Sequence, residues 1–314
     1  MNNFYYYIGN GAYCYANSTS MLLSSIGENI PSSLIEVLTG VGIGATLIRS
    51  KNLLYFNNQT LLPDLGLTKA LDILGFQYQT KVFDKPEDFP IDELRRDLKI
   101  SPAVIGPLDM SLLIYNPNHK YLKGADHFAL AYDLDEKFLY VHDPAGFPHV
   151  FLPLKQLKES WQANGVSYKK GYYRYTFSPK RIESPSDREI YERALNFFKK
   201  IYQEGETQTD RNKYGIGGEA IREFSAFIQK NGLKEKERGH FVYFVLPLGS
   251  KRALDYFKFF EPFNKELSRL KYQQSKIFGT AHTHAVDKDW SSLTKAFLNL
   301  AEVEEQFKNA LLNF

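Results

Sequence analysis

Apolar residues recur every three or four positions through most of the second half of the chain, which is the period of an α-helix. Five segments show this pattern: 188–203, 218–230, 250–263, 265–278 and 292–312. The apolar run HFVYFVLPL at 240–248 fits either a buried helix or a strand. Together these segments predict an all-helical domain over residues 186–314.

The first half of the chain mixes the helical period with strand-like runs. Helices are predicted at 14–26, 67–74 and 90–99. Strand-like runs lie at 103–105, 127–133, 137–143, 150–152 and 172–177. Helices segregated from antiparallel strands are typical of an α+β domain, which we place at residues 1–180. The polar, proline-containing stretch SPKRIESPSD at 178–187 marks the boundary between the two predicted domains.

Composition and charge narrow the class of protein. A length of 314 residues with 43% hydrophobic and 24% charged residues fits two folded domains. The net charge is +3 and the basic residues form no block, which argues against nucleic acid as a partner. No stretch approaches the roughly 18 apolar residues that cross a bilayer, and residues 1–7 lack the basic start of a signal peptide. A single cysteine forms no internal disulfide, so we expect a cytoplasmic protein without a membrane partner.

That single cysteine, Cys14, lies where a loop gives way to the first predicted helix, in the segment NGAYCYANSTSMLLSSIG at 10–27. A thiol in the first turn of a helix lies at the positive end of the helix dipole, which favours the thiolate. The glycines at positions 9 and 11 would let the backbone approach a substrate closely. Cys14 is therefore a candidate nucleophile, although a lone cysteine is also commonly a small buried hydrophobic residue.

A base and an orienting acid for this thiol are predicted in one hairpin. If the strands 127–133 and 137–143 pair around a loop at 134–136, His127 lies directly opposite Asp143. Such opposed residues have Cβ atoms about 4.5–5.5 Å apart, within hydrogen-bonding reach of imidazole and carboxylate. A bulge or a longer loop would change this register.

The residues between the two on the same face are small or apolar and could bury the pair: Ala129, Ala131, Leu139 and Val141. A purely structural pair at a sheet edge remains the alternative interpretation of His127 and Asp143.

The order of these residues resembles the papain-like cysteine peptidase superfamily: a cysteine at a helix start, then HF opening one strand, then DP closing the next. In detail the sequence is similar to the N-terminal domain of butirosin biosynthesis protein H and its relatives, in which a YCYANS-like segment precedes a helix. The resemblance covers residues 4–150, with a weaker likeness at 214–224. It implies a papain-like fold for the N-terminal domain, with Cys14 as nucleophile, His127 as base and Asp143 as orienting acid.

The resemblance further implies acyl transfer in small-molecule biosynthesis. The acyl group would pass from the thioester of an acyl carrier protein to Cys14, and then to a small-molecule amine acceptor. Candidate donors to the oxyanion are the Cys14 backbone N–H and the Asn10 side chain. Papain-like peptidases usually carry a glutamine shortly before the nucleophile, and no glutamine precedes Cys14. Two alternatives stay open: a cysteine peptidase or amidase with water as acceptor, and a binding module without turnover.

Two further motifs favour no cofactor. His282 and His284, in AHTHAVDKD at 281–289, share a face only in an extended segment, and no third strong ligand is evident. We therefore predict no metal and no other cofactor. The segment YGIGGEA at 214–220 opens a helix but lacks the lysine of a P-loop and follows no predicted strand. Close packing through its glycines is the simpler interpretation, and phosphate binding at this helix start the alternative.

Overall fold

The computed structural model describes residues 6–9, 13–58, 62–166, 168–169 and 171–314. The chain divides into two compact units, each made of two separate segments. Unit 1 comprises Met1–Ile35 and Pro63–Ser184, and unit 2 comprises Glu36–Leu62 and Pro185–Phe314. Both are described below as separate bodies.

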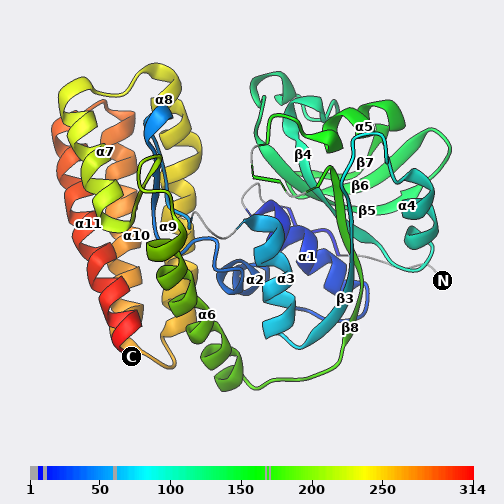
Figure 1. Ribbon diagram of the computed structural model, residues 1–314, viewed down its shortest axis with the longest axis horizontal. Coiled ribbons are helices and arrows are strands. Elements are labelled where there is room, and N and C mark those ends of the chain that lie inside the picture. Colours follow the sequence, from blue (N-terminus) through cyan, green and yellow to red (C-terminus); the bar gives the residue numbers. More distant parts are fainter. Residues whose placement is uncertain (1–5, 10–12, 59–61, 167, 170) are drawn as a thin grey trace. The chain divides into compact units, whose positions relative to one another are not determined.

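Unit 1 is built on a six-stranded antiparallel sheet with the strand order β3-β8-β4-β5-β6-β7 (Figure 1). Its strands are β3 (Phe76–Phe83), β4 (Ala103–Asp109), β5 (Asp126–Leu134), β6 (Phe138–Asp143), β7 (Phe147–Pro153) and β8 (Tyr173–Arg181). The helices of this unit are α1 (Cys14–Ser24), α3 (Pro63–Ile73), α4 (Ile91–Leu98) and α5 (Leu154–Gln162), and α2 (Ser32–Leu38) runs across the division between the units. Short 3-10 turns lie at Met110–Leu112 and His119–Tyr121.

One face of this sheet forms the main core of unit 1. Alternate residues of the strands point to the same side, so apolar residues two apart collect on one face. The four residues predicted to bury the His127–Asp143 hairpin belong to this core and are almost fully buried. Trp161 of α5 and Leu94 of α4 pack against the same cluster. This core fixes the backbone of β5 and β6.

Helix α1 is buried on all sides, because nine consecutive residues from Tyr15 to Leu23 are shielded from solvent. Four of the nine are polar (Asn17, Ser18, Thr19 and Ser20), so polar as well as apolar side chains of α1 lie in the core. It packs on β5, where the hydroxyl of Ser18 donates to the Phe128 carbonyl at 3.3 Å. The rings of Tyr15 and Phe128 meet edge to face with centroids 5.9 Å apart. These contacts hold the start of α1 against the strand that carries His127.

Unit 2 is mostly helical. Its helices are α6 (Asp187–Gln208), α7 (Gly217–Asn231), α8 (Glu235–His240), α9 (Leu246–Phe260), α10 (Lys265–Val286) and α11 (Trp290–Asn313), and a π-helical turn lies at Phe241–Val245. Aromatic residues dominate its core, with Phe224, Phe241 and Phe297 almost completely buried. The helical period of the sequence therefore predicts α6, α7, α9, α10 and α11 correctly, whereas the short helix α8 was not predicted. The apolar run at 240–248 is helical.

The prediction of an all-helical second domain is wrong in two respects. First, unit 2 contains a small antiparallel sheet of order β2-β1-β9, made of β1 (Thr46–Ile48), β2 (Leu53–Tyr55) and β9 (Tyr214–Ile216). Second, β1 and β2 come from residues 36–62, which the sequence analysis placed in the first domain. Strands this short carry too little periodicity to be recognised. The segment 214–220 contains a strand, β9, that leads directly into α7, contrary to our expectation that no strand precedes this helix start.

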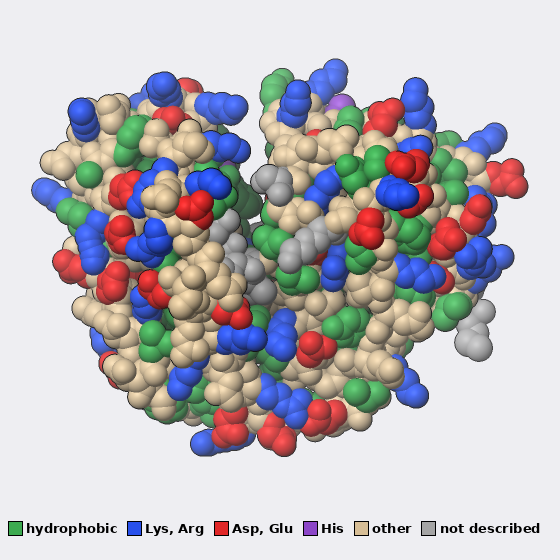
Figure 2. Space-filling view, viewed as in Figure 1, with side chains coloured by type: hydrophobic (Ala, Val, Ile, Leu, Met, Phe, Trp, Pro, Cys, Tyr) green, Lys and Arg blue, Asp and Glu red, His purple; other side chains and the backbone are tan. Residues whose placement is uncertain are grey.

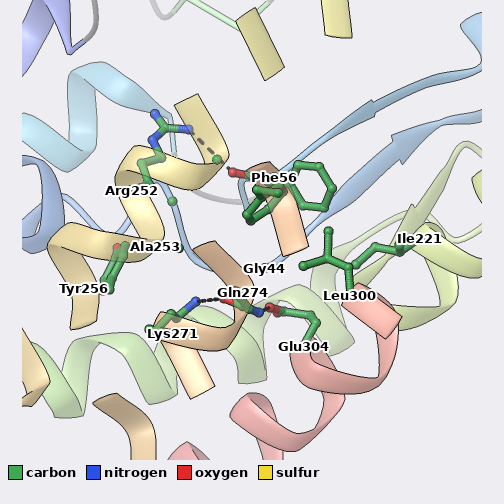
Figure 3. A pocket seen from close by; sticks show the side chains of 13 residues that line it. Gly44, Phe56, Ile221, Arg252, Ala253, Tyr256, Lys271, Gln274, Leu300 and Glu304 are labelled. Atoms are coloured by element: carbon green, nitrogen blue, oxygen red, sulfur yellow. Dashed lines mark hydrogen bonds between the residues drawn. The ribbon is translucent and has the colours of Figure 1, made fainter. Parts of the chain in front are cut away.

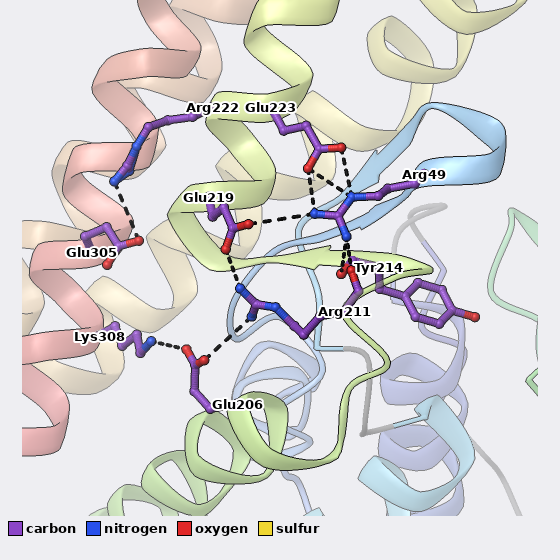
Figure 4. Close-up of polar contacts among 9 residues, drawn as sticks. All are labelled: Arg49, Glu206, Arg211, Tyr214, Glu219, Arg222, Glu223, Glu305 and Lys308. Atoms are coloured by element: carbon purple, nitrogen blue, oxygen red, sulfur yellow. Dashed lines mark hydrogen bonds and ion pairs between the residues drawn. The ribbon is translucent and has the colours of Figure 1, made fainter.

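Charged side chains fasten the inserted hairpin to the helices of unit 2 (Figure 4). Arg49, in the turn between β1 and β2, donates to the Glu223 carboxylate of α7 at 2.8 and 2.9 Å. Its guanidinium also donates to the Tyr214 carbonyl at 3.2 Å. Arg211 pairs with Glu219 in the same network. The hairpin is thus held by ion pairs as well as by its buried residues.

The outer surface carries both signs of charge. On the face seen in Figure 2, Lys and Arg side chains are interspersed with Asp and Glu. Within the part of the chain that the structure describes, no helix is long and apolar enough to cross a membrane.

Candidate active site

Cys14 is the first residue of α1 and is partly exposed. The preceding residue, Tyr13, has the left-handed conformation, with φ 65° and ψ 46°. Such a conformation is strained for a residue other than glycine and is concentrated at functional sites. The Tyr13 carbonyl already accepts the helical bond from Asn17 at 2.8 Å. This sharp entry places the thiol in the first turn, where backbone N–H groups have no helical acceptor.

His127 and Asp143 form a buried pair in unit 1. The Nε2 atom of His127 lies 2.7 Å from Oδ1 of Asp143, and the two side chains are 3% and 0% exposed. Cys14 lies near this imidazole, because its side chain is among the groups that raise the pKa of His127. Because Nε2 faces Asp143, Nδ1 is the ring nitrogen left for the sulfur. The structure therefore brings together three of the four residues that the sequence analysis selected.

The fourth selected residue, Asn10, lies outside the described residues. The other oxyanion candidate, the backbone N–H of Cys14, is at the start of α1 as expected.

The Asp143 carboxylate is held by donors that the sequence analysis did not identify. The backbone N–H of Ala145 donates to Oδ1 at 2.7 Å, and the hydroxyl of Tyr115 donates to Oδ2 at 2.7 Å. With His127, both carboxylate oxygens are engaged. No sequence signal pointed to Tyr115, because it lies in an irregular segment distant from the hairpin.

These contacts shift the pKa values of both members of the pair toward the charged forms. Burial by itself lowers the pKa of His127, but the charge and hydrogen bond of Asp143, together with those of Cys14, outweigh it and raise the pKa to about 10. Burial by itself raises the pKa of Asp143, but His127, the Ala145 N–H and Tyr115 outweigh it and lower the pKa. At neutral pH the pair is therefore an imidazolium and a carboxylate.

The cross-strand register behind this pair differs from the predicted one. Beyond a bulge between residues 131 and 133, Leu130 pairs with His142. Next to the loop, the residue opposite each β5 residue lies three positions later in the chain than predicted. Beyond the bulge it lies two positions later. Because an even shift keeps a residue on its face, His127 and Asp143 become diagonal neighbours rather than opposed ones. Diagonal partners are about 7–8 Å apart at the backbone, which an imidazole can span.

A second, partly buried phenol–carboxylate pair lies near the thiol. The hydroxyl of Tyr168 donates to Oδ2 of Asp126 at 2.6 Å. Burial is the main cause that raises the pKa of Tyr168 well above its ordinary value, followed by Asp126, and the charge of Cys14 contributes as well. Asp126 immediately precedes His127 in the chain. The start of β5 therefore supplies one member of the His127–Asp143 pair and one member of the Tyr168–Asp126 pair.

His282 and His284 are part of helix α10, so they do not lie in the extended segment that would place both on one face. The ring of His282 contacts the Val242 carbonyl at 3.1 Å, and His284 lies 3.7 Å from Asp289. Among the described residues, no group of three or more His, Cys, Asp or Glu is arranged to hold a metal ion.

Fold and site together define a mixed α/β protein with antiparallel sheets, a helical C-terminal region and a cysteine–histidine–aspartate cluster at the start of a buried helix. The sequence is 42% identical over 306 residues to the "Uncharacterized protein YobF" of Bacillus subtilis (strain 168), covering 98% of each chain. Residues 211–312 match the model of the YobF C-terminal domain. The chain belongs to the YobF family.

Proposed function

We propose that this protein is a cysteine-dependent acyltransferase whose unit 1 is a papain-like domain, with Cys14 as nucleophile, His127 as base and Asp143 as orienting acid. The observation that carries the proposal is the buried pair of His127 and Asp143, 2.7 Å apart, together with Cys14 at the start of α1 close enough to raise the pKa of His127. A nucleophile, its base and a group that orients the base are the three parts that thiol catalysis requires.

The proposed reaction has two steps. In the first, the Cys14 thiolate attacks the carbonyl carbon of a thioester, the bond from that carbon to the donor sulfur breaks, and the departing thiolate takes the proton of the His127 imidazolium and leaves as a thiol. In the second, an amine attacks the acyl-cysteine, neutral His127 accepts the amine proton, and Cys14 leaves as the thiolate. We propose the backbone N–H of Cys14, at the start of α1, as a donor to the oxyanion of both tetrahedral intermediates.

The surroundings of the thiol favour an amine as the acceptor. Tyr168 and Asp126 place a phenol and a carboxylate near Cys14, and a carboxylate attracts an approaching ammonium group. An acyl carrier protein is the donor that the sequence resemblance suggests. We propose hydrolysis only as the side reaction that occurs when water replaces the amine.

The proposal is tested by trapping the acyl-enzyme. Native protein and the variants Cys14→Ala and His127→Ala are incubated with an acetyl thioester of N-acetylcysteamine and weighed by intact-protein mass spectrometry. His284→Ala, which changes a partly exposed histidine of unit 2, is the matched control. We expect one acetyl group on the native protein and the control, none on Cys14→Ala, and acylation at least tenfold slower on His127→Ala.

The fate of the acyl group then identifies the reaction. Glycylglycine is added to the isolated acyl-enzyme, and acetylated dipeptide is measured against free acetate. Dipeptide as the main product supports transfer, whereas acetate alone supports a hydrolase. If the native protein gains no acetyl group, and iodoacetamide alkylates it no faster than His127→Ala at pH 6, then the proposed catalytic cluster is wrong.

A further inference from the structure

The N-terminal segment of unit 1 contacts the end of β6 through Tyr7. The hydroxyl of Tyr7 donates to the main-chain carbonyl of Asp143 at 2.9 Å. The Tyr7 ring also packs against the ring of His142, the residue before Asp143, with centroids 5.8 Å apart. The two bonded residues are 136 positions apart in the chain, so no local pattern in the sequence predicts this contact. It fastens the start of the chain to the strand end that carries the orienting acid.

The contact depends on a glycine two positions after Tyr7. A Cβ atom at Gly9 would overlap the hydroxyl and the adjoining ring carbon of Tyr7, so an alanine there would push the phenol out of its place. Only glycine lets the backbone pass so close to the ring. The sequence analysis expected the backbone at Gly9 to approach a substrate, whereas the structure shows a close approach to Tyr7.

Tyr7 holds a different part of Asp143 from its other partners. The groups described above contact the carboxylate, whereas Tyr7 bonds to the main chain. The next residue, Pro144, has no N–H with which to extend the hydrogen bonding of β6. The stretch of chain that carries Tyr7 continues to Cys14. Tyr7 therefore joins the segment that leads into the proposed nucleophile to the end of the strand that carries the proposed orienting acid.

We propose that Tyr7 is a positioning residue for the reaction of Cys14, and that its bond to the main chain of Asp143 keeps the carboxylate within reach of His127. This inference rests on the proposed function. A hydrogen bond weakens steeply when its donor and acceptor are displaced or misaligned. A small displacement of the end of β6 would therefore weaken the 2.7 Å contact that orients the imidazole. Tyr7 acts through Asp143 and takes no part in making or breaking bonds.

The test measures the rate of Cys14 alkylation by iodoacetamide in the full chain, between about pH 5 and pH 9. In Tyr7→Phe the ring stays and the hydroxyl is lost. We expect alkylation at pH 6 to slow by about three- to tenfold, the effect of losing one ordinary hydrogen bond. The pH at which the thiol becomes reactive should also rise, toward that of His127→Ala. Tyr6→Phe changes a neighbouring side chain that is 70% exposed, and this matched control should keep the native rate and pH profile.

Gly9→Ala breaks the same contact from the other side, because the added Cβ displaces the phenol while the hydroxyl is kept. It should slow alkylation and move the pH profile as Tyr7→Phe does, and the double variant should be no slower than Gly9→Ala alone. Gly279→Ala is its control, since a Cβ at this position of α10 meets no atom within 4 Å. Effects of Tyr7→Phe and Gly9→Ala that simply add would contradict a shared contact.

Tyr202→Phe separates a loss of stability from a loss of positioning. In the core of unit 2, the Tyr202 hydroxyl donates to one carboxylate oxygen of Glu304 at 2.6 Å, and the Gln274 amide donates to the other at 2.8 Å (Figure 3). Losing this hydroxyl should lower the thermal unfolding temperature and leave the alkylation of Cys14 unchanged. If Tyr7→Phe also lowers the unfolding temperature and keeps the native alkylation rate and pH profile, Tyr7 has a structural role only and the inference is wrong.

Comparison with His127→Ala distinguishes a failure of this inference from a failure of the proposed function. If the native protein is alkylated much faster than His127→Ala at pH 6, but no faster than Tyr7→Phe, the inference fails and the proposed function stands. If the native protein and His127→Ala are alkylated alike, the proposed function fails, and the positioning role of Tyr7 fails with it.

Discussion

Tyr115 holds one oxygen of Asp143, and its loss should weaken the orientation of His127. In Tyr115→Phe the hydroxyl that donates to Oδ2 at 2.7 Å is removed, and a hydrogen bond to a charged group contributes about 1.5–3 kcal/mol. We expect alkylation of Cys14 by iodoacetamide to slow by about tenfold at pH 7. Because Tyr115 also lowers the pKa of Asp143, the acid limb of the pH profile should move to higher pH in the variant.

The control for this experiment is Tyr121→Phe, since Tyr121 is 87% exposed. It should keep the native rate and the native pH profile. A purely structural role for Tyr115 would lower stability and leave the pH profile unmoved.

His142, the neighbour of Asp143 in the chain, should make the protein less stable in acid. Burial and the nearby His149 lower its pKa to about 4, against an ordinary value of 6.5. As the pH falls, His142 binds a proton in the unfolded chain at a higher pH than in the folded protein. The free energy of unfolding therefore decreases between about pH 6.5 and pH 4. In His142→Gln this loss is absent, so the variant should gain about 1–3 kcal/mol relative to the native protein between pH 7.5 and pH 4.5.

Urea unfolding of both proteins at the two pH values measures this difference. His127 changes stability with pH in the opposite direction, because its pKa is raised to about 10. The stability that His127 contributes is complete below pH 6.5 and is lost as the pH rises toward 10. If the difference in the free energy of unfolding between the native protein and His142→Gln is the same at both pH values, the lowered pKa does not belong to His142.

In the hairpin of β5 and β6, some features could be predicted from the sequence and others could not. Alternation of side chains along each strand predicted which residues share a face, and that prediction needs only the parity of the register. The bulge and the length of the loop depend on tertiary contacts, and no residue pattern specified them. The pair His127 and Asp143 could therefore be predicted, but its diagonal geometry could not. Tyr13, Tyr115 and Tyr168 were missed because irregular segments carry no periodicity.

The β1–β2 hairpin should depend on Arg49, which contacts a carboxylate and backbone carbonyls of unit 2. Networks of charge-assisted hydrogen bonds contribute more than isolated surface pairs, so Arg49→Met should cost about 1–2 kcal/mol. Hydrogen exchange of the amides at 46–55 should accelerate accordingly. Lys51→Met, in the same turn, changes an exposed side chain and should leave the exchange unaltered. Equal exchange rates in the two variants would show that the ion pairs do not fasten the hairpin.

In the molecule as a whole, the sequence predicted a boundary near 178–187, and the last of the three points at which the chain passes between the units falls there, between Ser184 and Pro185. Proline and polar residues mark such a link locally. The excursion of residues 36–62 into unit 2 has no local mark, because it is defined by partners more than a hundred residues away in the chain. Long-range assignment of this kind needs three-dimensional contacts.

A single cut should therefore not separate the two units cleanly. A fragment of residues 1–184 keeps the hairpin residues Leu47, Leu54 and Phe56 without the helices that bury them. We expect this fragment to aggregate and to bind the dye ANS. The same fragment with 36–62 replaced by a Gly/Ser linker should be monodisperse by size-exclusion chromatography. If the fragment that keeps residues 36–62 and the fragment with the linker behave alike, the hairpin does not belong to unit 2.

During synthesis, the β1–β2 hairpin is made well before the helices that cover it. The β1–β2 hairpin leaves the ribosome before all of residues 63–184, whereas the helices that shield it come last. At about 5–20 residues per second, the hairpin waits on the order of ten seconds for its partners. During that interval its apolar side chains are available to chaperones or to other nascent chains. Slower translation across 63–184 should therefore reduce the yield of native protein.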